Sequence, residues 1–241
     1  MKEFGFDYVL LDNEHSLVGK ESIYRYIRAC HENELPLIMR PEEKTDSFRC
    51  YLDSGVSGMM LPQVDTVEQA AYGVDQSYFP PIGHRGAGLG MSPYLLDGQK
   101  PAEMRLMEML QYVNDNTMLF PMTESLEGIS NLPQVLNLEG VTGTLVGGND
   151  LTIDIIFRTG QIDPDALRPE LMNNSYVLDR VKKIAEICKK AGKVAGIGGY
   201  PPKAYVERAR EGYQLFTVGY VANDDVENLR PVIAEVKALV K

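Results

Sequence analysis

The stretch FDYVLLDNEH at residues 6–15 passes from an apolar, β-branched segment directly into four polar residues, and the same change recurs along the 241-residue chain. Short apolar segments alternate with longer amphipathic ones, a pattern typical of repeated βα units. Strands are predicted at residues 7–12, 36–40, 58–62, 117–122, 143–147, 194–198 and 215–220. Helices are predicted at residues 19–33, 45–54, 66–74, 125–137, 173–191, 202–211 and 224–240.

Most of these strands are apolar throughout, as expected of parallel strands that are covered on both faces. The alternation therefore predicts an α/β fold, a TIM-type (β/α)8 barrel formed as a single domain over residues 1–241. Only seven strands are predicted, and the first begins a few residues after Met1. We therefore expect the first strand and helix of such a barrel to be absent. An open doubly-wound sheet is the alternative fold.

Two segments differ from this pattern. Residues 78–115 are rich in Pro and Gly and then in Met, which predicts an inserted loop and helix that cover the active-site mouth or a neighbouring subunit. Within it, the glycine-rich run at residues 83–88 does not follow a strand directly. A flexible loop or a subunit contact is therefore preferred there over nucleotide binding. Residues 158–172 are predicted to form a second polar loop.

Composition and charge exclude several classes of protein. A net charge of −10 argues against nucleic-acid binding, which relies on clustered Lys and Arg. The chain has no apolar run of the ~18 residues that a membrane span needs, and no basic-then-apolar leader is found. Cys30, Cys50 and Cys188 are far apart and not at metal-ligand spacing. These features together predict a cytoplasmic protein with reduced cysteines.

Polar residues follow the predicted strands at their carboxyl ends, where reactive groups collect in α/β barrels. Glu124 follows the fourth strand and Asp150 the fifth, so two carboxylates are predicted to lie near each other. No lysine ends a strand, which argues against a Schiff-base mechanism. The alternative way to stabilise an enolate is a divalent cation that acts as a Lewis acid, and two carboxylates suit Mg²⁺ or a similar hard ion.

A second group of candidates follows the first two strands. Arg40 ends the second strand and is predicted to bind a substrate carboxylate or to balance an enolate oxygen. A structural salt bridge with Asp12 or Glu14 is the alternative role. His15 lies just after the first strand, and Asp12, three residues earlier, is predicted to orient its ring and raise its basicity.

Together these segments resemble the HpcH/HpaI aldolase/citrate lyase family, in particular its class II pyruvate-dependent aldolases. The similar segments are FDYVLLDNEHS (6–16), IMRPEE (38–43), SGVSGMMLPQVDTVEQA (54–70), YFPPIGHRGAG (78–88) and MTESLEGISNLPQVLNLEGVTGTLVGGNDLT (122–152). The resemblance extends over nearly the whole chain.

The resemblance implies roles for individual residues. Glu124 and Asp150 match the metal ligands of the family, Arg40 matches the arginine that contacts pyruvate, and His15 with Asp12 matches the acid–base dyad. The predicted substrate-binding residues are Arg40, Met122, Gly148, Asn149 and Asp150. Met122 stands where these aldolases often have Gln, and Gly148-Asn149 replaces the more usual Pro-Ala. The implied cofactor is Mg²⁺, Mn²⁺ or Co²⁺.

The expected reaction is the reversible aldol cleavage of a 4-hydroxy-2-oxo acid to pyruvate and an aldehyde. Decarboxylation of oxaloacetate, which uses the same enolate, and cleavage of malyl-CoA or citramalyl-CoA, which uses the same kind of enolate chemistry, are alternatives. A non-catalytic or weakly active homologue with a binding or assembly role is the alternative from another class. The resemblance also implies a homo-oligomer, a trimer or hexamer, in which the C-terminal helix near residues 224–240 is exchanged between subunits.

Overall fold

The computed structural model describes residues 1–42, 48–90, 92–218 and 226–240. Its centre is one sheet of seven strands, in which each strand pairs in parallel with the next along the chain. The strands are β1 (Val9–Asp12), β2 (Leu37–Arg40), β3 (Gly58–Leu61), β4 (Met118–Thr123), β5 (Gly143–Gly147), β6 (Val194–Gly198) and β7 (Leu215–Thr217). This sequential order excludes a doubly-wound sheet, whose strand order reverses at a switch point.

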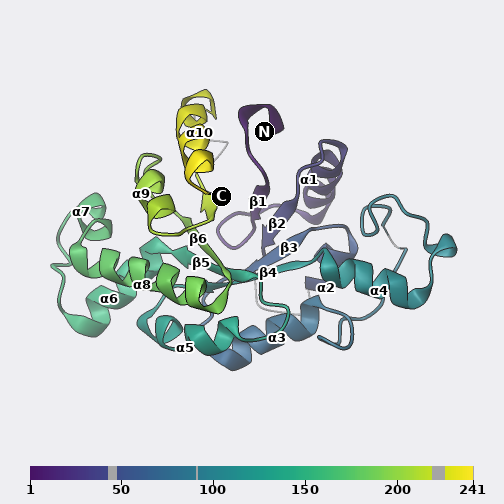
Figure 1. Ribbon diagram of the computed structural model, residues 1–241, viewed down its shortest axis with the longest axis horizontal. Coiled ribbons are helices and arrows are strands. Elements are labelled where there is room, and N and C mark those ends of the chain that lie inside the picture. The colour runs from purple at the N-terminus through teal and green to yellow at the C-terminus, as the bar shows by residue number, and fades with distance from the viewer. Residues whose placement is uncertain (43–47, 91, 219–225, 241) are drawn as a thin grey trace.

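The helices surround the strands (Figure 1). They are α1 (Lys20–Glu32), α2 (Phe48–Asp53), α3 (Val67–Ser77), α4 (Leu106–Asp115), α5 (Leu126–Leu136), α6 (Gly148–Thr159), α7 (Arg168–Met172), α8 (Ser175–Ala191), α9 (Ala204–Arg210) and α10 (Arg230–Leu239). Short 3-10 turns η1 (Lys2–Phe4), η2 (Pro101–Glu103) and η3 (Val226–Leu229) complete the described elements. Over the described residues the fold is a TIM-type barrel that lacks one of the eight strand–helix units, as predicted. Parts of three predicted elements lie outside the described residues: 45–47 of the helix at 45–54, 219–220 of the strand at 215–220, and 224–225 of the helix at 224–240.

Two predictions about the stretch after β5 were wrong. Residues 148–159 form the helix α6, where no helix was predicted, and α7 lies within the predicted loop at 158–172. The first two residues of α6, Gly148 and Asn149, are poor helix formers, so local propensity points away from a helix. Its buried side chains Leu151 and Ile155 belong to the main hydrophobic core, and this packing overrides the local preference.

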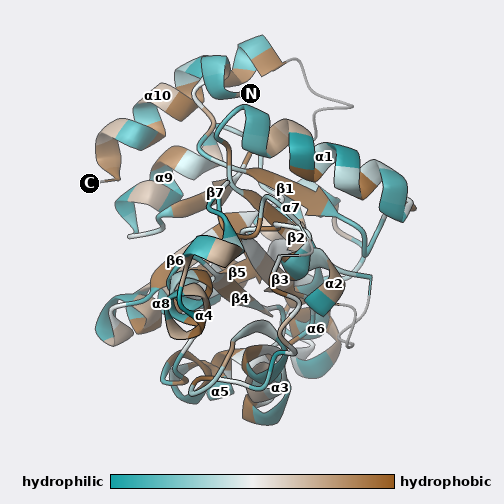
Figure 2. Cartoon of the chain, turned by 90° about the vertical axis from the view of Figure 1, so that its right-hand side faces the viewer, coloured by the Kyte–Doolittle hydropathy of each residue, from teal (hydrophilic) through white to brown (hydrophobic). Residues whose placement is uncertain are grey.

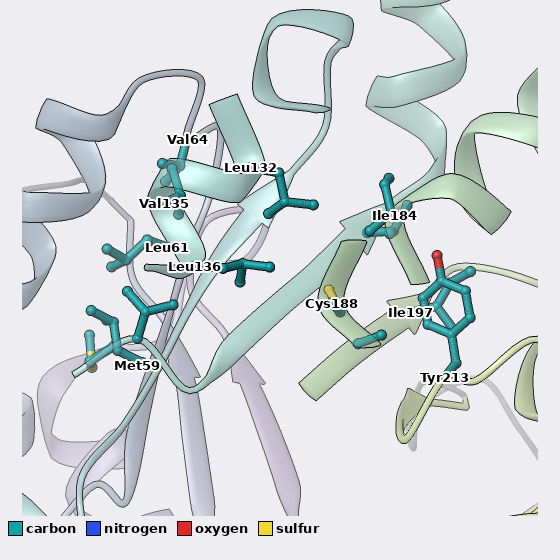
Figure 3. Close-up of a cluster of buried hydrophobic side chains, with 14 of the residues drawn as sticks. Met59, Leu61, Val64, Leu132, Val135, Leu136, Ile184, Cys188, Ile197 and Tyr213 are labelled. Atoms are coloured by element: carbon teal, nitrogen blue, oxygen red, sulfur yellow. The ribbon is translucent and has the colours of Figure 1, made fainter. Parts of the chain in front are cut away.

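Alternation along the strands divides the core into two layers. Met59 and Leu61 of β3 point outwards and belong to the main core, which also contains Leu136 of α5 and, farther along it, Cys188 of α8 (Figure 3). Met60, between them, belongs instead to a smaller cluster with Ile38, Phe120, Met122 and Leu145. Because this cluster draws one or two residues from each neighbouring strand, it fills the inside of the barrel and forms the floor beneath the strand ends.

Side chains bridge the gap between β1 and β7. The Tyr8 hydroxyl, just before β1, donates a hydrogen bond to the Phe216 carbonyl oxygen at 3.0 Å and lies 3.1 Å from the Thr217 hydroxyl. Burial raises the pKa of Tyr8 to about 12, so the phenol stays protonated and able to donate. A side chain therefore links the two outer strands where an eighth strand stands in a closed barrel.

The C-terminal helix α10 packs beside the N-terminal residues of the same chain. Arg230 donates to the Glu3 carbonyl oxygen at 3.0 Å and lies over the Phe4 ring, and Lys237 bonds to Asp7 at 2.6 Å. Figures 1 and 2 both place α10 next to the N-terminus. The exchange of this helix between subunits stays a prediction.

The segment between α3 and β4 has a small core of its own, formed by Phe79, Leu96, Met109 and Val113. Arg85, within the glycine-rich run, has a fully buried side chain that bonds to Asp53 at 2.7 Å. The run is therefore anchored to the barrel at Arg85 and is not a freely flexible loop. In the part of the chain that the structure describes, no helix is long and apolar enough to cross a membrane.

Candidate metal and acid–base site

The predicted site residues lie at the carboxyl end of the barrel. Asp12 ends β1 and Arg40 ends β2, and the two are direct neighbours in the strand register. Glu124 follows β4 without an intervening residue, and Asp150 lies in the first turn of α6, directly after β5. Parallel strands end on the same side of a sheet, so the fold brings these four side chains to one end of the barrel.

Arg40 is held by two carboxylates. Its Nε and Nη2 atoms donate to the two oxygens of Asp12 at 2.9 and 2.5 Å, and Nη1 lies 3.1 Å from Glu14 Oε2. Burial alone would raise the pKa of Asp12, but the hydrogen bonds and charge of Arg40 outweigh it and keep that pKa below its ordinary value. The structural salt bridge expected as an alternative role for Arg40 is therefore present, and it fixes the guanidinium at the strand ends.

Asp12 also shapes the turn that follows β1. Its Oδ1 atom accepts hydrogen bonds from the backbone N–H groups of Glu14 at 3.1 Å and of His15 at 3.3 Å. The carboxylate that lies beside the His15 ring is that of Glu14, with 3.4 Å between Oε2 and Nε2. The sequence spacing indicated Asp12 for this place and missed Glu14. The adjacent Glu14 and His15 in the sequence could have indicated this contact. The side chains of two consecutive residues come together, however, only when the backbone of the turn directs them to the same side.

Glu124 is the most buried carboxylate of the site, with 5% of its surface exposed. Its Oε2 atom accepts a hydrogen bond from the Gln63 backbone N–H at 2.7 Å, and its Oε1 atom is directed at Gly147. The next residue, Ser125, caps α5 through the Gly128 N–H and so fixes the chain direction after Glu124. Burial, together with the charges of Asp150 and Glu14, raises the pKa of Glu124 to about 7, against the opposing Gln63 hydrogen bond and the charge of Arg40.

The remaining predicted residues take different places. Asp150 is exposed, and Asn149 accepts hydrogen bonds from Arg168 at 2.8 and 3.2 Å. Gly148 is buried so closely against Tyr200 that a Cβ atom there would lie 2.9 Å from the ring. Met122 is 2% exposed and belongs to the cluster inside the barrel. Asp150 thus faces solvent at the mouth, while Met122 contributes to the floor.

The charges of this region favour a cation. Asp12, Glu14, Glu124 and Asp150 all act electrostatically on the same small region, where Arg40 supplies the fixed positive charge. Carboxylate oxygens are the ligands preferred by hard divalent ions. Among residues 1–42, 48–90, 92–218 and 226–240, no three His, Cys, Asp or Glu side chains form a ready-made metal cage. The residues present fit an open site in which Glu124 and Asp150 supply two ligands and water or substrate supplies the others.

The raised pKa of Glu124 predicts a pH-dependent affinity for such a cation. Below about pH 7 a proton and the cation compete for the same carboxylate, so we expect the affinity for Mn²⁺ to fall about tenfold for each pH unit. Titration calorimetry with the full chain between about pH 5.5 and 8 would measure it. An affinity that stays constant from about pH 7.5 to 6 would contradict ligation by Glu124.

Comparison with known proteins places this arrangement in a family. Residues 1–219 match the HpcH/HpaI aldolase/citrate lyase family. A 2-keto-3-deoxy-L-rhamnonate aldolase of Escherichia coli is 26% identical over 216 residues, which cover 89% of this chain and 74% of the relative. The crystal structure of an HpcH/HpaI aldolase from Desulfitobacterium hafniense DCB-2 superposes with a TM-score of 0.78 at 22% identity, covering 98% of this chain and 85% of that one.

The fold is shared with a protein of another named activity. The citrate synthase SbnG superposes with a TM-score of 0.73 at 22% identity, covering 97% of this chain and 83% of that one. The family match extends over most of the chain, and the relative reported above from the sequence comparison is an aldolase. The chain therefore belongs to the HpcH/HpaI aldolase/citrate lyase family and is an enzyme of the lyase class.

Proposed function

We propose that the chain is a divalent-cation-dependent aldolase that reversibly cleaves a 4-hydroxy-2-oxo acid to pyruvate and an aldehyde. The observation that carries this proposal is the buried Glu124 carboxylate, whose pKa of about 7 lies far above its ordinary value, beside the charge of Asp150. Arg40 and His15 follow neighbouring strands at the same end of the barrel. The similarity to a 2-keto-3-deoxy-L-rhamnonate aldolase supports a 2-oxo acid as the substrate class.

In this proposal Glu124 and Asp150 hold Mg²⁺, Mn²⁺ or Co²⁺. When bound, the cation supplies Lewis-acid stabilisation of the negative charge that develops on the oxo acid. Glu124 is suited to this because it is buried and its Oε2 is fixed by the Gln63 N–H, so this ligand needs little rearrangement. Asp150 is exposed at the mouth, where the site can open to substrate.

Arg40 binds the anionic end of the substrate in this proposal. Its guanidinium has five N–H donors, and the two hydrogen bonds to Asp12 and the ion pair with Glu14 leave two for substrate oxygens. Because Asp12 holds the planar group from one side, its orientation is set before substrate arrives. The side chain is 11% exposed, so it is largely enclosed at the strand ends.

His15 acts as the general base and acid. Its ring is 62% exposed, at the mouth of the site, where a substrate hydroxyl can reach it. In cleavage, the imidazole takes the proton of the C4 hydroxyl while the C3–C4 bond breaks and its electron pair stays with the pyruvate fragment as an enolate. The enolate then takes a proton from solvent at C3 to give pyruvate. In condensation, the imidazolium returns this proton to the new hydroxyl.

The proposed function is tested by the products released from a set of substrates: pyruvate from the oxo acids, pyruvate and acetyl-CoA from citramalyl-CoA, and glyoxylate and acetyl-CoA from malyl-CoA. Purified protein is given 4-hydroxy-2-oxo acids, oxaloacetate, malyl-CoA and citramalyl-CoA, with Mg²⁺, Mn²⁺ or Co²⁺ and after treatment with a chelator. We expect pyruvate and an aldehyde from a 4-hydroxy-2-oxo acid, loss of turnover with the chelator, and recovery when the cation is restored. Turnover of oxaloacetate or a CoA thioester alone would replace this assignment with a decarboxylase or a CoA-thioester lyase. Cation binding without turnover of any substrate would indicate a binding or assembly role.

We also propose that the chain acts as a homo-oligomer, a trimer or hexamer. The large apolar side chains of Ile153 and Phe157 on α6 are 52% and 83% exposed, and Leu167 before α7 is 69% exposed. Apolar surface of this kind is often covered by a partner. These exposed residues follow Asp150 in the chain. This supports an assembly in which a neighbouring subunit packs beside the proposed site.

A further inference from the structure

Asp154 of α6 connects the two βα units that carry the proposed cation ligands. Its Oδ2 atom accepts a hydrogen bond from the Leu126 backbone N–H at 2.8 Å. Leu126 is the first residue of α5 and lies two residues after Glu124. Asp154 itself lies four residues after Asp150, about one turn further along α6. The bond therefore joins the segment after Glu124 to the helix that carries Asp150.

The Leu126 N–H needs an acceptor from outside its own helix. The first N–H groups of an α-helix have no partner within the helix. Ser125, the N-cap residue of α5, accepts through its hydroxyl from the Gly128 N–H. A negative side chain is also favoured near the positive N-terminal end of a helix. Asp154 thus supplies an acceptor and a favourable charge at the start of α5.

The Asp154 carboxylate is held on its other side by Arg158. Arg158 Nε donates to Asp154 Oδ1 at 2.6 Å, and the Asp154 side chain is 17% exposed. Arg158 also lies 3.8 Å from Glu127 on α5, in a pair in which both side chains are about half exposed. Ion pairs between exposed side chains contribute little. The hydrogen bond to the Leu126 N–H is therefore the contact through which Asp154 holds α5 and α6 together.

Together with the sheet, this bond closes a ring around the proposed ligands. β4 and β5 pair in parallel, with Thr123 beside Val146 in the register. Glu124 follows Thr123 directly, and α6 begins two residues after Val146. The two βα units are thus joined before Glu124 and Asp150 by the strands, and after them by Asp154.

We propose that Asp154 is a positioning residue of the cation site, which sets the separation of the segments that carry Glu124 and Asp150. This inference rests on the proposed function for the identity of the ligands. Asp154 does not bind the cation itself, since its two oxygens accept from Leu126 and Arg158. Partners that orient metal ligands typically account for 10- to 100-fold in affinity. Asp154 acts through the backbone, so we expect an effect at the lower end of that range.

Three variants separate this role from a purely structural one. Asp154→Ala removes the acceptor of the Leu126 N–H and places a good helix former in α6. Asp154→Asn keeps a carbonyl oxygen as acceptor and is the conservative variant. Arg158→Gln is the matched control, because it removes both ion pairs of Arg158 and leaves the Leu126 hydrogen bond in place.

Titration calorimetry of the full chain with Mn²⁺ and urea unfolding are carried out on the same preparations. We expect Asp154→Ala to bind Mn²⁺ about 10-fold more weakly and Asp154→Asn to recover most of this loss. Arg158→Gln should stay within about 3-fold of the unmodified chain. A purely structural cap would lower the free energy of unfolding of Asp154→Ala and leave the Mn²⁺ affinity of the folded chain unchanged. That result, or an equal loss of affinity in Arg158→Gln, would overturn the assignment.

Hydrogen exchange tests the contact without any cation. We expect the amides at the start of α5 to lose most of their protection in Asp154→Ala and to keep it in Arg158→Gln, because only the first variant loses the acceptor of the Leu126 N–H. Unchanged exchange in Asp154→Ala would contradict the inference.

The outcomes also distinguish this inference from the proposed function. If the unmodified chain binds Mn²⁺ but turns over none of the tested substrates, the proposed function fails and the role of Asp154 at the cation site stands. An active chain whose Asp154→Ala variant keeps full Mn²⁺ affinity would refute the inference alone. Absence of Mn²⁺ binding in the unmodified chain would refute both.

Discussion

Glu124→Gln is expected to abolish cation-dependent turnover while leaving the cation-free protein more stable than the unmodified chain. The amide has nearly the same shape and can still accept the hydrogen bond from the Gln63 N–H. It lacks the negative charge that a divalent cation needs. Loss of an outer partner of a metal ligand typically costs 10- to 100-fold in affinity, so loss of the ligand itself should cost at least ~100-fold. We expect kcat/KM to fall on the order of 10³-fold.

The stability effect has the opposite sign because the pKa of Glu124 is raised from its ordinary value of 4.5 to about 7. Such a carboxyl is neutral in the folded protein below about pH 7. Its favourable contribution is complete below pH 4.5 and is lost as the pH rises through about 7. Above that pH the buried charge costs about 3 kcal/mol, which Gln does not carry. At pH 8 without cation, we expect the free energy of unfolding to rise by about 2 kcal/mol.

Urea unfolding and calorimetry with Mn²⁺ on the same preparations would measure both effects. Glu127→Gln is the matched control, since Glu127 is exposed on α5, three residues after Glu124. Its replacement should alter neither the affinity for Mn²⁺ nor the free energy of unfolding. If the variant binds Mn²⁺ with the same affinity as the unmodified chain, Glu124 is not a ligand of the cation. A variant that loses both activity and stability would indicate a structural role instead.

Gly147→Ala is the second change with a large expected effect. The backbone of Gly147 has φ −86° and ψ 90°, which alanine can adopt, so the cost is not in the main chain. The added Cβ atom would lie 1.9 Å from Glu124 Oε1 and 2.7 Å from its carboxyl carbon. The carboxylate must therefore move, and Glu124 is too buried to turn freely away.

We expect this one added methyl group to lower cation affinity and kcat/KM each by at least ~100-fold, comparable to removing the ligand charge. Gly86→Ala is the control, because a Cβ atom there meets no atom within 4 Å. Circular dichroism should show a folded barrel for both variants. If Gly147→Ala retains full cation affinity, then the orientation of Glu124 seen here is not the one that binds the ion.

The sequence by itself indicated where the chemistry of this protein lies. Apolar segments followed by Asp12, Arg40, Glu124 and Asp150 identify strand ends, and parallel strands must end on one side of a barrel. Because of this rule, residues that follow different strands in the sequence can be placed at the same end of the barrel before any contact between side chains is known. The shared location of the two carboxylates from neighbouring strands followed from it, whereas the family was indicated by the resemblance of whole segments such as residues 122–152.

Contacts between particular side chains were decided only by the tertiary structure. Whether Asp12 or Glu14 meets the His15 ring depends on the turn after β1, where Asp12 turns to the backbone and to Arg40. The helix α6 forms because Leu151 and Ile155 are buried, against the preference of Gly148 and Asn149. The reason is physical: a repeating pattern reports average burial, whereas a hydrogen-bond partner is selected by distance and direction once the chain has packed.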